Sequence, residues 1–239
     1  MVKRAFEVIP GERWLFLFAH PDDEVAILAW IAHLVAQNAA VRCVWMHSTP
    51  VRESESRAVM ARVGVVDLHF HQLPDGGLVD SLGELCAVVH AQGQWDRVVT
   101  MAYEQGHLDH DSVNFAANRA YAGHVLEFPM YWAYYRGFMH LNEFANGPHE
   151  VRHLPEEGQQ LKREAIRMFP SQTIQRNIFW YGIYRRIVGR PLKFEARELL
   201  RWQGETDFTQ SIHTGKTAEK VLACRHWQRW SAAIRDFKS

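Results

Sequence analysis

Two clusters of histidine and acidic residues contain the side chains of this sequence that are best suited to chemistry. The first spans residues 20–24 (HPDDE), and the second spans residues 106–111 (GHLDHD). Imidazole and carboxylate groups together form a ligand set that suits zinc. A carboxylate beside such a metal, but not bound to it, can accept a proton from a hydrolytic water. The two clusters therefore predict a metal-assisted hydrolytic site, provided that the fold brings them together.

Each cluster follows a short apolar run and precedes a helix-like stretch. Residues 14–19 (WLFLFA) lead into the first cluster, and residues 97–102 (RVVTMA) lead into the second. Such runs, followed by turn-forming and acidic residues, are typical of buried strands that stop at the edge of a sheet. Open α/β folds place their functional side chains at this edge. We therefore expect both clusters to follow strand ends and to converge on one metal ion.

Apolar runs alternate with helix-like segments along the first half of the chain. The expected strands are 14–19, 40–46, 66–72, 98–101 and 125–130, and the expected helices are 24–37, 52–62, 81–92 and 111–121. Two further helices are expected at 162–169 and 218–236. This alternation is typical of a parallel sheet with crossover helices. The predicted fold class is α/β, a Rossmann-like three-layer α/β/α arrangement with a mostly parallel sheet and a C-terminal extension.

The length of 239 residues fits one α/β domain, and no repeat or linker divides the sequence. We expect a single domain over residues 1–239. In this interpretation about residues 1–150 form the sheet and the metal site. The remainder, about residues 151–239, forms an extension that shapes the substrate pocket.

The composition argues against several classes of partner and compartment. Lys and Arg number 27, as do Asp and Glu, so no basic field recruits nucleic acid. The three cysteines are widely scattered, which indicates a reducing compartment rather than a disulfide framework. No apolar stretch is long enough to span a bilayer, and the N-terminus lacks the features of a secretory signal. We therefore expect a cytoplasmic protein without a transmembrane segment.

The two clusters, together with three further motifs, resemble the zinc-dependent N-acetylglucosaminyl de-N-acetylase family, the PIG-L or LmbE-like deacetylases. The resemblance begins with residues 19–24 (AHPDDE) and 107–110 (HLDH), although Leu108 stands where the family usually has proline. It continues in the R-E-x-E pattern at residues 52–55 and in the L-P-D-G pattern at residues 73–76. A final match is the K-x-x-A-I element that ends in Ser171 and Gln172.

This resemblance implies an activity and a cofactor. The implied reaction is hydrolysis of the N-acetyl group of an N-acetylglucosamine-type sugar conjugate, which releases acetate and a free amine. The substrate would be a small-molecule or lipid-linked amino sugar. The resemblance implies one zinc ion per chain, with three ligands: His20, Asp23 and His110. Iron(II) in place of zinc stays open, because such a ligand set tolerates several divalent ions.

The resemblance also implies the remaining roles in the site. Asp22 becomes the general base that activates the hydrolytic water, and His107 becomes the acid on the oxyanion side. Asp109 becomes the carboxylate that orients His107. Four residues are implied to contact the substrate, namely Arg52, Asp75, Ser171 and Gln172.

Two other functions remain open at this point. Residues 105–110 (QGHLDH) match the H-x-H-x-D-H motif of dinuclear metallo-β-lactamase-type hydrolases except at Gln105. That rival leaves the first cluster unexplained, and it predicts two metal ions per chain. The second alternative is a non-catalytic sugar-binding relative, but the sequence keeps the implied base and all the implied ligands.

Two aromatic stretches, residues 128–140 and 178–188, have no role in the implied site. Aromatic side chains are most often used to cover a sheet or fill a core. The first stretch could instead stack on a sugar. The second stretch combines aromatic and basic residues, so we hypothesise that it forms a lid or an acceptor wall, or that it makes peripheral contact with a membrane.

Overall fold

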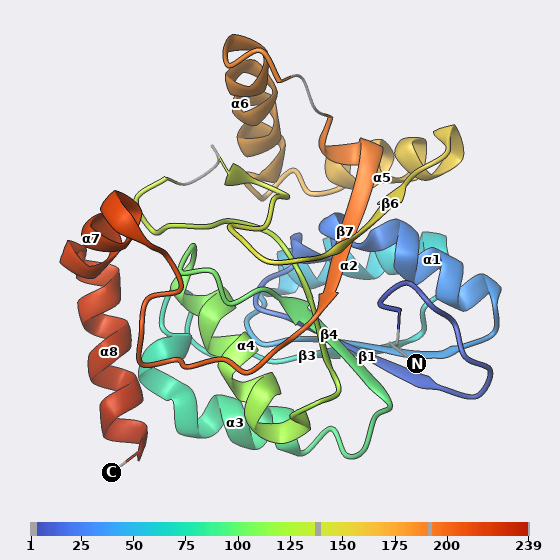
Figure 1. The fold of residues 1–239 in the computed structure, drawn as a ribbon. Coiled ribbons are helices and arrows are strands. Elements are labelled where there is room, and N and C mark those ends of the chain that lie inside the picture. The colour runs from blue at the N-terminus through green and yellow to red at the C-terminus, as the bar shows by residue number, and fades with distance from the viewer. Residues whose placement is uncertain (1–3, 137–139, 191–192, 239) are drawn as a thin grey trace.

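A seven-stranded sheet forms the centre of the computed structural model, which describes residues 4–136, 140–190 and 193–238 (Figure 1). The strand order is β3-β2-β1-β4-β5-β7-β6. The first five strands pair in parallel, whereas β7 is antiparallel to both β5 and β6. The strands are β1 (Arg13–Phe18), β2 (Ala40–Trp45), β3 (Asp67–Phe70), β4 (Arg97–Met101), β5 (Val125–Phe128), β6 (Glu150–His153) and β7 (Arg197–Trp202).

Helices cover both sides of the sheet (Figure 1). On one side, α1 (Leu28–Ala36) contacts α2 (Pro50–Val63) and α5 (Glu156–Arg167). On the other side, α4 (Leu108–Tyr121) packs against α3 (Leu82–His90), and α3 contacts α8 (Arg225–Lys238). The remaining elements are α6 (Ile174–Ile187), α7 (Gly215–Ala223) and the short 3₁₀ turns η1 (Asp23–Ala26), η2 (Leu78–Ser81) and η4 (Phe194–Ala196). The predicted fold class, a mostly parallel sheet between helices, is therefore confirmed.

The strand β1 lies in the middle of the sheet and is buried on both faces. Phe16 pairs with Cys43 of β2 on one side and with Val99 of β4 on the other. Helices on both sides of a parallel sheet exclude water from both faces of its central strands, so β1 is continuously apolar from Trp14 to Phe18. Trp14 on one face of β1 packs edge-on against Trp30 of α1, with 5.6 Å between ring centroids. This central strand directs residue 20 toward the edge of the sheet.

The strands β6 and β7 were not among the strands predicted from the sequence. Residues 150–153 (EVRH) alternate between partly buried and exposed positions and carry charged side chains, so they form no apolar run. Both strands come from the C-terminal part of the chain, yet they extend the same sheet as the first five. The C-terminal extension therefore contributes to the sheet as well as to the surface.

Helix boundaries also differ from the predictions: α5 begins at Glu156 rather than at residue 162, and α4 begins at Leu108 rather than at residue 111. The helix expected from residue 24 begins as the 3₁₀ turn η1, and α1 starts only at Leu28. The helix expected at 218–236 is two helices, because Cys224 has an extended backbone (φ −83°, ψ 153°) between α7 and α8. Among the described residues, every helix is too short or too polar to cross a membrane.

The two aromatic stretches have different structures. Most of residues 178–188 lies in the helix α6. The stretch 128–140 leaves β5 and continues mainly without regular structure, and its residues 137–139 lie outside the described residues. Within it, Tyr134 donates a hydrogen bond of 2.6 Å to the Asp111 carboxylate at the start of α4. Part of this stretch therefore packs beside the second His/Asp cluster.

Candidate active site

The first cluster lies on a tight turn at the carboxyl end of β1. Asp23 holds this turn closed, because its Oδ2 accepts the backbone N–H of Ala19 (3.1 Å) and of His20 (2.9 Å). Asp22 has a φ of 111°, in a region that non-glycine residues rarely occupy. Such strain costs on the order of 1–3 kcal/mol and is concentrated at functional sites. The turn therefore holds the Asp22 backbone in a conformation that the surrounding contacts must stabilise.

Glu24 stabilises the strained turn through a hydrogen bond to its backbone. Its carboxylate is fully buried and accepts three hydrogen bonds, from the Asp22 backbone N–H (2.9 Å), the Trp45 indole (3.1 Å) and the Ser56 hydroxyl (2.5 Å). Burial raises the pKa of Glu24 to about 7, although the hydrogen bond from Ser56 opposes the shift. Glu24 thus connects the turn to β2 and α2.

A buried lysine fixes the other end of the same segment. The Lys162 ammonium of α5 is fully buried, donates to the Ala26 carbonyl (2.9 Å) and lies 3.6 Å from the Glu198 carboxylate. Glu198 in turn accepts the backbone N–H of Ala29 at 2.7 Å. A buried ion pair of this kind does more for specific geometry than for net stability. The C-terminal elements therefore hold the start of α1 in place.

The second cluster lies at the start of α4. His107 caps this helix, and its Nδ1 accepts the backbone N–H of Asp109 at 3.3 Å. The Asp111 carboxylate accepts the backbone N–H groups of Glu104 and Gln105, both at 3.2 Å, and so shapes the loop before the helix. Gly106 has no space for a side chain, because a Cβ there would lie 2.0 Å from the Tyr131 carbonyl oxygen.

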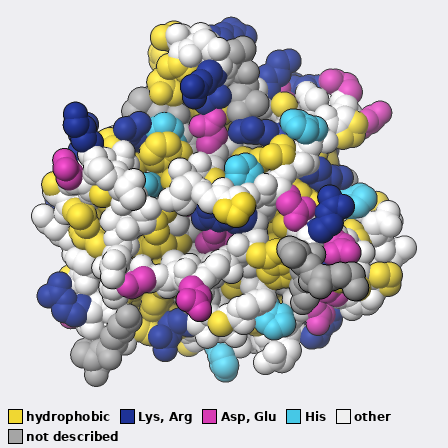
Figure 2. Space-filling view, in the orientation of Figure 1, with side chains coloured by type: hydrophobic (Ala, Val, Ile, Leu, Met, Phe, Trp, Pro, Cys, Tyr) yellow, Lys and Arg dark blue, Asp and Glu magenta, His cyan; other side chains and the backbone are white. Residues whose placement is uncertain are grey.

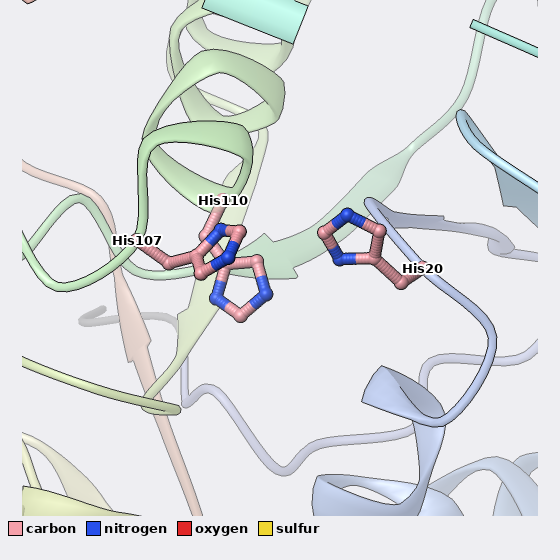
Figure 3. Close-up of side chains that lie close together, drawn as sticks. All are labelled: His20, His107 and His110. Atoms are coloured by element: carbon pink, nitrogen blue, oxygen red, sulfur yellow. The ribbon is translucent and has the colours of Figure 1, made fainter. Parts of the chain in front are cut away.

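The fold brings the two clusters together, as the sequence predicts. Figure 3 shows His20, after β1, facing His107 and His110 at the start of α4. Ring nitrogens of the three histidines lie within 4.8 Å of one another. The Asp23 carboxylate lies 3.1 Å from His110 Nε2 and 3.9 Å from His20 Nδ1. Three imidazoles and one carboxylate therefore converge, and this donor set fits a zinc ion.

The Asp109 carboxylate contacts His20 and not the side chain of His107. Its Oδ2 lies 3.0 Å from His20 Nε2 and accepts the Gly76 N–H at 2.7 Å, while its Oδ1 accepts the Leu78 N–H at 3.1 Å. Within the described residues, no hydrogen bond joins this carboxylate to the His107 ring. Because a carboxylate only accepts, His20 Nε2 carries the hydrogen, and in the neutral ring Nδ1 is left with a lone pair on the Asp23 side.

A cavity of about 320 Å³ opens beside these groups. Its lining comes from both clusters, α2, the turn after β3 and the start of α6: His20, Asp22, Asp23, Arg52, Asp75, Gly106, His107, His110, Tyr131, Gln172, Thr173 and Asn177. Three of the four expected substrate residues are in this lining. The fourth, Ser171, donates its hydroxyl to Glu55 of α2 at 2.6 Å instead.

Some residues near the cavity were not expected from the sequence. Tyr131 packs nearly parallel to His110, with 5.8 Å between ring centroids, and accepts a hydrogen bond from Asn177 at 3.3 Å. His47, which lies in none of the sequence motifs, is 3.6 Å from Asp75. The aromatic character of residues 128–140 was the one signal in the sequence that pointed to Tyr131.

Asp75 contacts positively charged groups from two different elements, α2 and the turn after β1. Its carboxylate lies 3.2 Å from the Arg52 guanidinium and 3.3 Å from His20 Nε2. The hydrogen bond with His20 is the main reason that the pKa of Asp75 lies below its ordinary value, even though the side chain is half exposed.

Burial and neighbouring charges shift the pKa values of Asp22 and Asp23 in opposite directions. Burial, together with the charges of Asp23 and Glu24, raises the pKa of Asp22 well above its ordinary value. Burial would also raise the pKa of Asp23, but His110 and His20 outweigh it and lower that pKa to about 2. Adjacent carboxyl groups are thus differentiated, with Asp23 held as an anion and Asp22 able to take up a proton.

The two histidines nearest the cavity are shifted in opposite directions. Burial would lower the pKa of His20, but the contacts with Asp109 and Asp75 raise it to about 10. Burial, together with the charges of His110 and His20, lowers the pKa of His107 to about 3. The His107 imidazole is therefore neutral near pH 7.

Comparisons with known proteins agree with this site. Residues 15–121 match the family model described as PIG-L, GlcNAc-PI de-N-acetylase, and this range contains both clusters. The resemblance predicted from the sequence is therefore confirmed over residues 15–121. Among the curated proteins, none matches the chain in sequence.

Several solved structures share the fold. Teicoplanin deacetylase Orf2, in a zinc-inhibited form, matches with 15% identity and a TM-score of 0.58 over 81% of this chain and 100% of that one. The conserved protein TT1542 from Thermus thermophilus matches with 15% identity and a TM-score of 0.58 over 82% and 97%. N,N'-diacetylchitobiose deacetylase from Pyrococcus horikoshii matches with 18% identity and a TM-score of 0.50 over 80% and 84%.

Proposed function

We propose that this chain hydrolyses the N-acetyl group of an N-acetylglucosamine-type sugar conjugate and releases acetate and a free amine. The observation that carries the proposal is the convergence of His20, Asp23 and His110 beside Asp22 at one cavity. All four residues lie in the segment that matches the GlcNAc-PI de-N-acetylase model. This family match supports N-deacetylation of a sugar-type substrate.

In this proposal His20, Asp23 and His110 hold one zinc ion per chain. Asp23 suits the role because it stays anionic, with a pKa of about 2, and because it already contacts both histidines. Zinc in this position would polarise the acetyl carbonyl and lower the pKa of a water molecule. Metal analysis of protein purified without added metal distinguishes zinc from iron(II).

Asp22 is the proposed general base. Its raised pKa suits a carboxyl group that must take a proton from water near neutral pH. The residue lines the cavity, and the hydrogen bond from its backbone N–H to Glu24 fixes its position. The proton that Asp22 receives is the one needed later by the departing amine.

His107 is the proposed donor to the oxyanion. Its Nδ1 accepts a backbone hydrogen bond, so the neutral ring carries its hydrogen on Nε2. With a pKa of about 3, the ring donates as imidazole rather than as imidazolium. A fixed donor in a site sheltered from water stabilises a developing oxyanion without prior reorganisation.

Arg52, Asp75 and Gln172 are the proposed contacts for the sugar or its aglycone, because their side chains line the cavity that the three histidines also line. Tyr131 offers a ring for the apolar face of a sugar, since amphipathic aromatic rings favour such packing. Ser171 is proposed to act indirectly, because its hydroxyl also accepts a hydrogen bond from Gln172 at 2.7 Å.

We also propose that residues 1–239 act as one deacetylase domain, because the elements after residue 150 complete both the sheet and the cavity. A cytoplasmic location is proposed from the three cysteines. Each of them is a free thiol, which suits a reducing compartment.

A second candidate function, a dinuclear hydrolase, rests on one observation. Donor atoms of His20, Asp75 and Asp109 form another group within 4.8 Å. Metal stoichiometry decides between the candidates, because the deacetylase needs one ion per chain and the dinuclear hydrolase needs two.

The test of the proposed function is acetate release across a panel of N-acetylglucosaminyl conjugates. Wild-type, zinc-loaded protein is expected to release acetate and a stoichiometric amine from at least one conjugate. Binding of the conjugates without any release would favour the sugar-binding alternative and refute the proposal.

A further inference from the structure

The region around α6 is positively charged in a protein whose charges otherwise balance. From Ala165 to Phe194 the sequence contains no Asp or Glu, although the whole chain has 27 acidic and 27 basic residues. The same segment contains six basic residues: Arg167, Arg176, Arg185, Arg186, Arg190 and Lys193. Arg185 is paired with Glu143 at 2.6 Å, and the other five basic residues make this segment a local basic region.

The outward face of α6 combines this charge with exposed apolar side chains. Phe179 is 62% exposed, Trp180 is 48% exposed and Ile187 is 78% exposed. They lie on one side of the helix with Arg176 and Arg186, which are also exposed, because residues three, four and seven positions apart share a face. We call these five residues the α6 outer face.

The opposite side of α6 faces the protein. Ile174 and Tyr181 are buried there. Figure 1 shows α6 projecting from the body of the molecule, and Figure 2 shows apolar and basic side chains together on this projection. Phe179 and Trp180 are the aromatic residues among the exposed large hydrophobic side chains of the described residues, and exposed apolar groups that gather on one element often mark an interaction site.

The α6 outer face lies next to the mouth of the candidate site. Thr173 and Asn177, at the start of the helix, line the cavity. Asn177 also donates a hydrogen bond to Tyr131, whose ring packs against His110. A surface that docks on this face would therefore lie close to the entrance of the cavity.

We propose that the α6 outer face docks on an anionic phospholipid surface. Aromatic rings settle at the boundary between headgroups and acyl chains, and arginines at the same level attract anionic headgroups. The helix lies on the surface and does not cross it, consistent with the absence of a membrane-spanning helix among the residues described.

Charge argues for lipid over a second copy of the chain. In a symmetric dimer each α6 outer face would meet its own equivalent. Arg176 and Arg186 would then face like charges, and no acidic residue occurs between residues 165 and 194; the next one, Glu195, lines a cavity with Arg186. An anionic lipid surface, in contrast, complements both the charge and the apolar side chains.

The test is flotation of the full, zinc-loaded protein with lipid vesicles. We expect binding to phosphatidylcholine vesicles that contain phosphatidylserine and not to phosphatidylcholine alone. Arg176→Gln/Arg186→Gln is expected to weaken binding about 25-fold, about fivefold for each charge. Phe179→Ala/Trp180→Ala is expected to reduce binding by more than tenfold. Raising the salt concentration should also weaken it.

The matched control is Val66→Ala, because Val66 is 91% exposed, apolar and located just before β3. This variant is expected to float like the wild type. Acetate release from a water-soluble conjugate should be unchanged in the Phe179→Ala/Trp180→Ala variant, which confirms that it is folded. Absence of flotation, equal flotation of that variant, or a dimer that the same substitutions dissociate would each overturn the proposal. If the protein does not bind vesicles, its acetate release is not affected. Failure of the docking proposal can therefore be distinguished from failure of the proposed function.

Discussion

The contact between Asp109 and His20 leads to a prediction about metal affinity. The Asp109 carboxylate receives three hydrogens, from His20 Nε2 (3.0 Å), the Gly76 N–H (2.7 Å) and the Leu78 N–H (3.1 Å). In Asp109→Asn one oxygen becomes an NH₂ group, which can only donate. Whichever way the amide turns, at least one of the three donors loses its acceptor.

The magnitude follows from what this contact does to His20. In the neutral ring that would bind a metal, with hydrogen on Nε2, His20 presents the Nδ1 lone pair toward Asp23, and the Asp109 carboxylate makes that nitrogen more basic. Removing such a partner of a metal-binding histidine typically weakens metal affinity by about 10- to 100-fold, or about 1.4–2.8 kcal/mol. We expect Asp109→Asn to fall in this range.

The assay is competition between the protein and a calibrated zinc chelator. Asp75→Asn is the matched control, since Asp75 also lies near His20 Nε2, at 3.3 Å, but its side chain is 49% exposed and water can replace it. We expect this control to change zinc affinity by less than about threefold. Wild-type zinc affinity in Asp109→Asn, with only turnover reduced, would show that Asp109 serves His107 and would refute the reasoning.

Three other predictions concern turnover, pH and packing. Asp22→Asn should retain zinc and lose about 10²- to 10⁴-fold in kcat for acetate release, and undiminished kcat would exclude Asp22 as the base. The folded protein binds a proton on Glu24 more tightly than the unfolded chain does, because its pKa is about 7 rather than 4.5. The loss of this proton should therefore lower the free energy of unfolding by about 2–3 kcal/mol between pH 5 and pH 8. In urea unfolding, the Glu24→Gln variant should lack this contribution to the pH dependence. Gly106→Ala should lower stability by about 1–3 kcal/mol or more, because its Cβ would lie 2.0 Å from the Tyr131 carbonyl. Gly83→Ala is the control, because Gly83 in α3 has open space around it, and this substitution should be neutral or slightly stabilising. Urea unfolding of both variants measures the difference.

Much of the candidate site could be predicted from the sequence because its proposed ligands are local in two segments. The pairs His20 with Asp23 and His107 with His110 are each separated by three positions, and each follows an apolar strand. Strand ends of a parallel sheet meet at one edge, so the convergence of the segments follows from the fold class. The role of each group depends on its partners, and for the Asp109 carboxylate these partners come from two other segments, the turn after β1 and the turn after β3.

The rest of the site depends on contacts that no short segment of sequence contains. Asp109 contacts His20 and not the His107 ring because the turn after β3 supplies two backbone N–H groups that fix its carboxylate. Tyr131 and Asn177 reach the cavity from an irregular segment and from a helix whose positions are set by packing alone. Likewise, β6 has no apolar pattern, because its partly buried positions hold Glu150 and Arg152 and its apolar Val151 is exposed.

The sequence alone thus determined the alternating strands and helices and the two clusters that end at strand edges, since periodicity and composition act over short distances along the chain. The tertiary structure decided which histidine each carboxylate serves, which carboxyl group keeps its proton and which face of α6 is left exposed. These properties arise from burial and from charges brought together through space, and neither can be read from neighbouring positions in the chain.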